Sequence, residues 1–580
     1  MMSRTVLFVC VSLGLFLGAC APNRETTPLV DLPVSIGSVA IGSEAAVVSI
    51  DGFATQVGLD VLRQGGNAVD ASIAVGFALA VTYPAAGNIG GGGFMTLYLA
   101  DEDRFTTLDF RERAPLAADP GMYLGEDGRP VRGLNRRGWL AAGVPGTVAG
   151  FEKAHRQWGK LPWRDLVEPA IRLADEGILL TPDLASSLAR VADTFGPFPA
   201  SAAAFLRPDR TPYAVGDRLR QPDLAWSLHR IADQGAAAFY TGEIAERLTR
   251  AMASNGGLIT MEDLAAYEAI ERPPIRGSYR GYEVISMPPP SSGGTILVEM
   301  LNILEALDLS RHEGPNDPQV LHLMVEAMRQ GYLDRAKYLG DSDHIEIPIE
   351  RLTSKQYARS VAVDIVPGKA RRSAALGADI LVAQESAETT HYSVVDGSGN
   401  AVSTTYTIEA GYGSRAMAEG TGFLLNNEMS DFNAWPGVTD ERGWYIGTEP
   451  NLIAPGKRML SSMTPTIVAR DGKPVMLVGS PGGKTIINTV LRVITNVVDF
   501  DLGLADAVAA PRLHHQWMPD RIFVEQSFAP ELLDRLRGFG HEVAVSRRGR
   551  QGDANCIYIY PDGARLAIAD PRRPGGAAAY

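Results

Sequence analysis

A run of hydroxyl side chains between residues 389 and 409 is the part of this sequence best suited to covalent chemistry. Thr, Val and Tyr on either side of Gly397-Ser398-Gly399 favour two strands joined by a tight turn. A hairpin centred on Ser398 pairs Thr389 with Thr407, and a bulge would shift this register by one residue. Strand alternation puts these side chains on one face: Thr389, His391, Ser393, Ser403, Thr405, Thr407 and Glu409. Hydroxyls with no lysine or arginine beside them indicate a nucleophile and its hydrogen-bond partners.

The same stretch resembles the signature of the γ-glutamyltransferase family, which belongs to the N-terminal-nucleophile hydrolase superfamily. The resemblance implies that Thr389 becomes the nucleophile when a precursor cuts itself between Glu388 and Thr389. The freed α-amino group, with a pKa of about 7.7–8.0, can then accept the hydroxyl proton. Thr407, across the hairpin, would hydrogen-bond the Thr389 hydroxyl. This chemistry needs no cofactor, and the alternative is a plain threonine-rich strand pair.

A glycine-rich loop provides a second candidate element. Residues 479–483, Gly-Ser-Pro-Gly-Gly, separate a strand-like from a helix-like segment, so that their backbone amides can approach a ligand closely. The resemblance assigns Gly482 and Gly483 to the oxyanion hole of acyl transfer. The following Lys484-Thr485 also mimics the end of a phosphate-binding loop, but that motif requires glycine where this sequence has Val478.

A γ-glutamyl group carries a carboxylate and an amine, so its site needs side chains of both charges. A guanidinium suits bidentate capture of a carboxylate, whereas isolated acidic residues are usually just solvated. Two of the acidic residues, at positions 409 and 428, stand where many relatives have Asn and Gln. The resemblance assigns Arg111, Ser461 and Ser462 to the carboxylate, and Glu409, Glu428 and Asp431 to the amine.

Two further features have a functional and a structural interpretation. Residues 435–447 form a long Gly-rich segment that the resemblance implies is a lid, with Trp444 or Tyr445 as the covering ring; the alternative is a surface loop. Adjacent His514-His515 are of a residue type that ligates metals, but neighbouring residues point to opposite faces of a strand, and no metal-binding motif accompanies them. We therefore expect these histidines to be structural and the site to contain no metal.

The N-terminus predicts export. Residues 1–19 read as a signal peptide, and Leu17-Gly18-Ala19-Cys20 resembles a bacterial lipobox with Cys20 as the lipidated residue. The alternative is an ordinary cleavage site with a chance cysteine. Ala21 favours the outer membrane, facing the periplasm, and residues 20–38 look like a flexible tether. Cys556 is then the single cysteine of the folded part, and the net charge of −13 argues against nucleic acid as a partner.

Mixed helix and strand patterns give an α/β or α+β fold, to which the resemblance adds a four-layer αββα architecture. Helices are expected within 53–83 and 485–500, an amphipathic helix over 320–339, and strands at 94–99, 105–110, 463–469 and 475–479. The resemblance makes 39–388 a large chain and 389–580 a small chain of one folded unit.

The expected enzyme is a γ-glutamyltransferase and glutathione hydrolase that passes a γ-glutamyl group through Thr389 to water or to an amino acid or peptide amine. A related cephalosporin acylase or poly-γ-glutamate-processing enzyme is the near rival, and Arg111 with Ser461-Ser462 argues against the acylase. A non-catalytic lipoprotein that binds amino acids is the rival from another class. The nucleophile, the glycine pair and the cleavage junction argue against it.

Overall fold

The computed structural model describes five stretches of the chain, residues 38–129, 131–377, 389–434, 448–546 and 549–580. The signal peptide, Cys20, Glu388, Trp444 and Tyr445 lie outside the described residues. None of the helices in these stretches has the length and apolar composition that spanning a bilayer requires.

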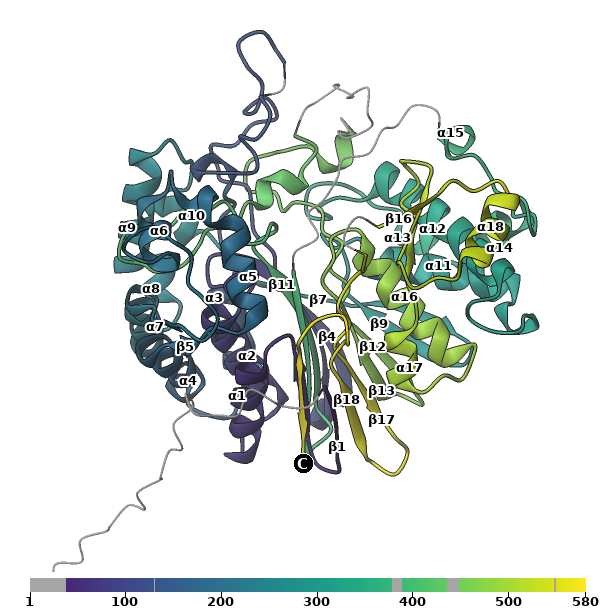
Figure 1. Ribbon diagram of the computed structural model, residues 1–580, viewed down its shortest axis with the longest axis horizontal. Helices are drawn as coiled ribbons and strands as arrows, with labels where there is room; N and C mark the ends of the chain where they lie inside the picture. The colour runs from purple at the N-terminus through teal and green to yellow at the C-terminus, as the bar shows by residue number, and fades with distance from the viewer. Residues whose placement is uncertain (1–37, 130, 378–388, 435–447, 547–548) are drawn as a thin grey trace, which may run out of the picture.

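Within the described residues, two seven-stranded antiparallel sheets form the centre of the molecule (Figure 1). The first sheet has the order β19 (Gly576–Ala579), β2 (Ala46–Ser49), β10 (Thr390–Val395), β11 (Ala401–Thr407), β3 (Gly92–Leu99), β4 (Arg104–Phe110) and β7 (Ile270–Arg272). The second sheet has the order β1 (Val39–Gly42), β18 (Arg565–Ile568), β17 (Cys556–Ile559), β13 (Lys473–Val478), β12 (Thr466–Arg470), β9 (Tyr282–Ser286) and β8 (Ile275–Tyr279).

Strands β10 and β11 form the predicted hairpin in the middle of the first sheet. His391 pairs with Thr405 and Ser393 with Ser403, which confirms the register centred on Ser398. Strands β2 and β3 flank the hairpin on its two sides. Thr389, directly before β10, is therefore held at the end of a central strand.

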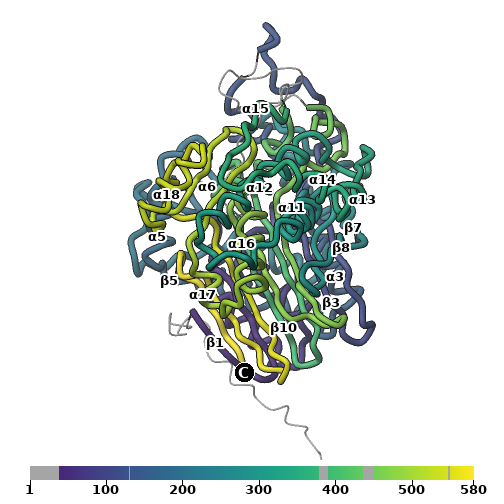
Figure 2. The backbone as a smooth tube through the Cα atoms, turned by 90° about the vertical axis from the view of Figure 1, so that its right-hand side faces the viewer, coloured from purple at the N-terminus to yellow at the C-terminus, as the bar shows by residue number. Residues whose placement is uncertain are grey.

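The two sheets pack face to face through apolar side chains. Val48 and Tyr98 of the first sheet belong to the same buried cluster as Ile285, Ile467 and Leu477 of the second. Helices cover both outer faces, and Figure 2 shows those of the second sheet in front of the strands. The molecule is therefore an α+β protein with four αββα layers, as predicted.

The helices divide between the two outer faces in sequence order (Figure 1). On the side of the first sheet lie α1 (Gly52–Arg63), α2 (Ala68–Thr82), α3 (Thr147–Trp158), α4 (Trp163–Glu176), α5 (Pro182–Val191), α6 (Pro199–Phe205), α7 (Pro222–Gln234), α8 (Ala237–Tyr240), α9 (Glu243–Ser254) and α10 (Met261–Ala265). On the side of the second sheet lie α11 (Gly293–Leu307), α12 (Pro318–Tyr338), α13 (Ile349–Leu352), α14 (Lys355–Val363), α15 (Ser373–Leu376), α16 (Thr485–Val498), α17 (Leu504–Ala509) and α18 (Pro530–Gly538).

Two smaller sheets complete the strands of the described residues. One pairs β5 (Ile178–Leu179) with β6 (Arg218–Leu219), and the other joins β14 (Leu513–His514), β15 (Ile522–Val524) and β16 (Val543–Val545).

Helix α12 differs from its sequence pattern. It has nearly the predicted bounds, but every residue from Val320 to Arg335 is buried, so the helix is not amphipathic in its surroundings. Its polar face is buried against polar groups of other elements: Asp334 accepts a hydrogen bond from the Tyr357 hydroxyl of α14, and Tyr332 donates one to the backbone carbonyl of Lys484. A helix surrounded on all sides belongs to the core, and this one reaches from the outer layer to the candidate site.

Candidate active site

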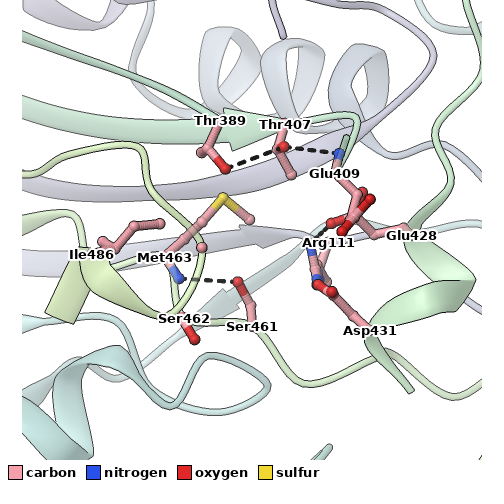
Figure 3. Close-up of a pocket in the computed structure, with 11 residues that line it drawn as sticks. Arg111, Thr389, Thr407, Glu409, Glu428, Asp431, Ser461, Ser462, Met463 and Ile486 are labelled. Carbon is pink, nitrogen blue, oxygen red and sulfur yellow. Dashed lines mark hydrogen bonds and ion pairs between the residues drawn. The ribbon is translucent and has the colours of Figure 1, made fainter. Parts of the chain in front are cut away.

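A small cavity lies where the first sheet, the second sheet and the loops above them meet (Figure 3). It is lined by nearly all of the described residues predicted for catalysis or substrate binding, with Met463 and Ile486 as additional apolar walls. Gly482, next to the lining residue Gly483, is not part of the lining. The lining residues are Arg111, Thr389, Thr407, Glu409, Glu428, Asp431, Ser461, Ser462, Met463, Gly483 and Ile486.

Thr389 and Thr407 form one wall of the cavity. Thr389 Oγ1 donates to Thr407 Oγ1 over 3.4 Å, a long hydrogen bond, and the backbone N–H of Glu409 donates to the same Thr407 oxygen over 2.9 Å. Thr389 is 5% exposed. The Glu409 backbone has φ +70°, which turns the chain out of the sheet after β11, and its carboxylate accepts a hydrogen bond from the Asn427 side chain. The hairpin therefore presents the Thr389 hydroxyl to the cavity, and the backbone amide of Glu409 holds the adjacent Thr407 hydroxyl in place.

Arg111 lies at the opposite end of the cavity, directly after β4 (Figure 3). Its guanidinium pairs with both Glu428 and Asp431, which lie in the single-turn 3₁₀ helix Glu428–Asp431, and it donates to the backbone carbonyls of Met459 and Leu460. Arg111 is thus paired with Glu428 and Asp431, two of the three acidic residues expected to bind the substrate amine.

A further carboxyl group, Glu112, lies 3.6 Å from the Arg111 guanidinium. Both oxygens of Glu112 are buried without a hydrogen-bond partner, and this burial raises its pKa to about 8, against the lowering effect of Arg111. Burial lowers the pKa of Arg111, but the charges of Glu428, Asp431 and Glu112 outweigh that effect and keep it above its ordinary value. Arg111 therefore stays charged, and Glu112 is able to hold a proton at neutral pH.

The glycine pair follows β13 and precedes α16. Gly482 has φ +138° and Gly483 has φ +56°, in the region that favours glycine. The carbonyls of these two residues accept from the backbone amides of Thr485 and Ile486 at 3.1 and 3.0 Å, which joins the loop to the first turn of α16. The positive end of that helix therefore lies next to a cavity wall, which suits stabilisation of an oxyanion.

His391 connects the hairpin to this glycine loop. Its two ring nitrogens contact the hydroxyls of Thr405 at 2.8 Å and Ser393 at 3.1 Å. Burial lowers its pKa to about 3, so the ring is neutral. A Cβ on Gly479 would lie 2.3 Å from this ring, so glycine at 479 allows the loop to approach the hairpin. His391 is thus a packing residue that brings the two predicted reactive elements together.

The histidines at 514 and 515 belong to hydrogen-bond networks. The ring of His514 contacts Asn488 at 2.6 Å and Gln516 at 2.9 Å. The ring of His515 accepts from the backbone amide of Trp517 at 3.2 Å, and burial lowers its pKa to about 3. These contacts support the structural interpretation.

A different group with metal-binding residue types was not singled out from the sequence. His322, Glu326 and His541 place potential ligand atoms within 4.8 Å of one another, all buried. The two rings already share a 2.8 Å hydrogen bond, and Arg329 and Arg371 both donate to the Glu326 carboxylate. Because two guanidinium groups neutralise this carboxylate and would repel a cation, the group is better explained as an ion-pair network.

Comparison with known proteins gives the family. The sequence model of gamma-glutamyltranspeptidase matches residues 54–580. The glutathione hydrolase proenzyme of Escherichia coli strain K12 is 46% identical over 575 residues, which cover 98% of this chain and 97% of that protein. The cephalosporin acylase from Bacillus halodurans aligns with a TM-score of 0.83 at 27% identity, over 97% of this chain and 99% of the other. The gamma-glutamyltranspeptidase of Helicobacter pylori aligns with a TM-score of 0.54 at 45% identity, over 55% of this chain and 90% of the other. The chain therefore belongs to the γ-glutamyltranspeptidase family.

Proposed function

We propose that this protein is a γ-glutamyltransferase and glutathione hydrolase that activates itself by cleavage between Glu388 and Thr389. The observation that carries the proposal is the cavity, in which a buried threonine at the start of a central strand faces a glycine loop, a guanidinium and a pair of serines. The similarity to the glutathione hydrolase proenzyme of E. coli supports the same activity.

Self-cleavage would begin with attack of Thr389 Oγ1 on the Glu388 carbonyl carbon. The peptide C–N bond then breaks, an ester forms at Thr389, and water hydrolyses that ester to a Glu388 carboxylate and a free Thr389 hydroxyl. The α-amino group released in this step becomes the base for later turnovers, because its ordinary pKa of about 7.7–8.0 leaves a neutral fraction at physiological pH.

Catalysis would repeat the attack on a γ-glutamyl amide. Thr389 Oγ1 bonds to the γ-carbonyl carbon, the amine leaves with a proton, and the γ-glutamyl ester passes to water or to an amino acid or peptide amine. The amides of Gly482 and Gly483 are proposed to stabilise the oxyanion in both halves, which gives ping-pong kinetics.

The glutamyl group itself would lie between the two charged sets of the cavity. Arg111, Ser461 and Ser462 are proposed for its carboxylate, and the acidic residues for its amine. In the unliganded cavity the acidic side chains of Glu428 and Asp431 hold Arg111, so substrate binding exchanges part of an internal ion pair for contacts to both substrate charges.

Several sequence predictions remain part of this proposal. They are a large chain of 39–388 paired with a small chain of 389–580, a lid carrying Trp444 or Tyr445, export through the signal at 1–19, and a periplasmic outer-membrane anchor at Cys20 behind the tether 20–38.

The decisive experiment separates the two chains on a denaturing gel and sequences the N-terminus of the smaller one, for the wild type, Thr389→Ala and Thr390→Ala. We expect two bands, the smaller starting at Thr389, in the wild type and in Thr390→Ala. Thr390 is a matched control because its buried hydroxyl has no hydrogen-bond partner. Thr389→Ala should give one uncut band, and cleavage in that variant would refute the assignment of the nucleophile.

Donor specificity is decided by a second assay on the processed protein. We expect release of aniline from a γ-glutamyl anilide and much slower release of aniline from the corresponding glutaryl anilide, which lacks the α-amine. The reverse preference would place this protein with the acylases that share its fold.

A further inference from the structure

The charge balance of the cavity raises a question about how a carboxylate is captured. Among the described lining residues, Arg111 is the single cation, while Glu409, Glu428 and Asp431 are acidic. Arg111 is already paired with two of these carboxylates. A substrate carboxylate that enters this cavity therefore needs hydrogen-bond donors and positive charge from a second direction.

A second guanidinium lies directly behind the serine wall. Arg335, near the end of α12, is 7% exposed and does not line the cavity. Its Nη2 donates to Ser462 Oγ over 3.1 Å, and its Nε donates to Ser292 Oγ over 2.9 Å. Both bonds come from a charged donor, which makes them stronger than bonds between neutral groups.

Ser292 extends this contact to the other serine of the pair. Its hydroxyl and its backbone amide both donate to the backbone carbonyl of Ser461, over 2.7 and 2.8 Å. Arg335 therefore supports Ser462 directly and Ser461 through one intermediate residue. The same helix also reaches the glycine loop, because Tyr332, one turn earlier, donates to the Lys484 carbonyl.

The direction of these hydrogen bonds determines what the serines can offer. A hydroxyl oxygen that accepts from a guanidinium must turn its own proton away from that guanidinium. Ser462 is in this position, and Ser461 Oγ similarly accepts from the backbone amide of Met463 over 3.1 Å (Figure 3). A hydroxyl polarised in this way is a better donor to a further acceptor. Two such hydroxyls on one wall suit a carboxylate.

We propose that Arg335 is a positioning residue for the α-carboxylate of the donor substrate: it orients and polarises Ser462, fixes Ser461 through Ser292, and places a positive charge behind both. This inference rests on the proposed function. It assigns to the buried helix α12 a part in substrate specificity, although none of its residues lines the cavity.

The test compares two anilide donors that differ in a single group. One is the γ-glutamyl anilide, and the other is the 4-aminobutyryl anilide, which has the same chain and amine but no α-carboxylate. In Arg335→Gln we expect KM for the γ-glutamyl donor to rise about 10- to 100-fold with kcat within about 3-fold, and kcat/KM for the 4-aminobutyryl donor to stay within about 2-fold. Arg335→Lys should recover part of the loss.

Two further variants define the pathway of the effect. Ser462→Ala combined with Arg335→Gln should raise KM for the γ-glutamyl donor by less than the product of the two single effects, because part of the Arg335 effect acts through Ser462 and residues in one network are not additive. Lys337→Gln removes a cation from the same end of α12 and should leave kcat and KM for both donors unchanged. The yield of cleaved chains and the melting temperature are measured for each variant.

The outcomes separate this inference from the proposed function. If the wild type does not turn over the γ-glutamyl anilide, the proposed function and the inference about Arg335 are both refuted. If the wild type is active but Arg335→Gln weakens both donors equally, Arg335 is merely structural and the inference alone is overturned. If Arg335→Gln is not processed, the donor comparison is made in Arg335→Lys, where a selective KM increase of about 3- to 10-fold supports the inference and an equal effect on both donors refutes it.

Discussion

Thr389 Oγ1 lies 3.4 Å from Thr407 Oγ1, directly beyond the first paired positions, Thr390 and Tyr406, of a central β-hairpin. The Thr407 oxygen also accepts the backbone amide of Glu409, over 2.9 Å. Thr407 is thus fixed by the turn that follows its strand and can hold the Thr389 hydroxyl in one orientation before and after chain cleavage.

Replacement of Thr407 should therefore affect the rate of self-cleavage. Thr407→Val keeps the shape but leaves the Glu409 amide without this acceptor, at a cost of about 1–3 kcal/mol, and removes the contact to Thr389. We expect processing to slow by about 10-fold or more, whereas Thr407→Ser should process at nearly the wild-type rate. A time course of the two chains on a denaturing gel measures both.

The control for this variant is Ser403→Ala, on the same strand. The Ser403 hydroxyl is buried without a hydrogen-bond partner, so its removal should not change the rate of processing. Equal processing rates in Thr407→Val and Thr407→Ser would show that the hydroxyl has no role.

The glycine loop permits a sharp test of the proposed oxyanion hole. A Cβ on Gly482 would lie 2.3 Å from Thr485 Oγ1, and φ is +138°, so Gly482→Ala must displace the loop and its amides. Loss of one oxyanion donor lowers kcat about 10²- to 10³-fold, and we expect a fall of at least about 10²-fold in steady-state kcat on processed protein.

Gly472→Ala separates backbone strain from the loss of the oxyanion donor. Gly472 precedes the same strand β13 at its other end, has φ +76°, and has open space around an added Cβ. We expect some loss of stability and an unchanged kcat. A similar fall in kcat for both variants would remove the glycine pair from the proposed mechanism.

Arg111 should not be replaceable by lysine. Its guanidinium reaches Glu428, Asp431 and two backbone carbonyls at once, and an ammonium group cannot reproduce that planar arrangement. We expect Arg111→Lys to raise KM for a γ-glutamyl anilide about 10²-fold, measured by initial rates. Arg113→Lys is the control, since the Arg113 guanidinium donates to the backbone carbonyls of Gly456 and Ala266 and does not line the cavity, and it should leave KM within about 3-fold. A small KM effect in Arg111→Lys would show that Arg111 holds the acidic residues rather than the substrate.

The sequence predicted the hairpin in detail because strand alternation and a glycine turn are local signals. Residue pairing such as His391 with Thr405 follows from them directly. The contact of Arg111 with Glu428 joins residues 317 positions apart, so local pattern could not reveal that they pair with each other. The family resemblance brought both to one site but gave them separate roles.

Helix α12 was predicted as an element, but its surroundings could not be predicted from its sequence. Its charged residues repeat at helical spacing, which predicts a solvated face. In the fold this face is buried against other polar groups, and Arg335 reaches the serine wall through it. A buried polar face and a solvated one have the same sequence pattern, so a residue such as Arg335 is recognised only once the helix is seen inside the core.

The buried carboxyl of Glu299 predicts a pH dependence of stability. Glu299 lies on α11, and neither of its oxygens has a hydrogen-bond partner. Burial first, and then the negative charge of Asp334, raise its pKa well above the ordinary value of 4.5. Above that ordinary value the folded state binds more protons than the unfolded state, so this group lowers stability progressively as pH rises toward the raised pKa; below it, both states are protonated and the effect vanishes.

Glu299→Gln keeps the shape of the protonated group without the cost of ionisation. Between about pH 5 and about pH 8, we expect the melting temperature of Glu299→Gln to fall less than that of the wild type. The difference between the two falls should be about 1–3 °C in a chain of this size. Glu313→Gln makes the same chemical change at an exposed site and should retain the wild-type pH dependence. If the melting temperatures of the wild type and Glu299→Gln change equally with pH over this range, Glu299 does not stay protonated in the folded protein. The cost of burying its charge would then be offset by a favourable interaction of the carboxylate.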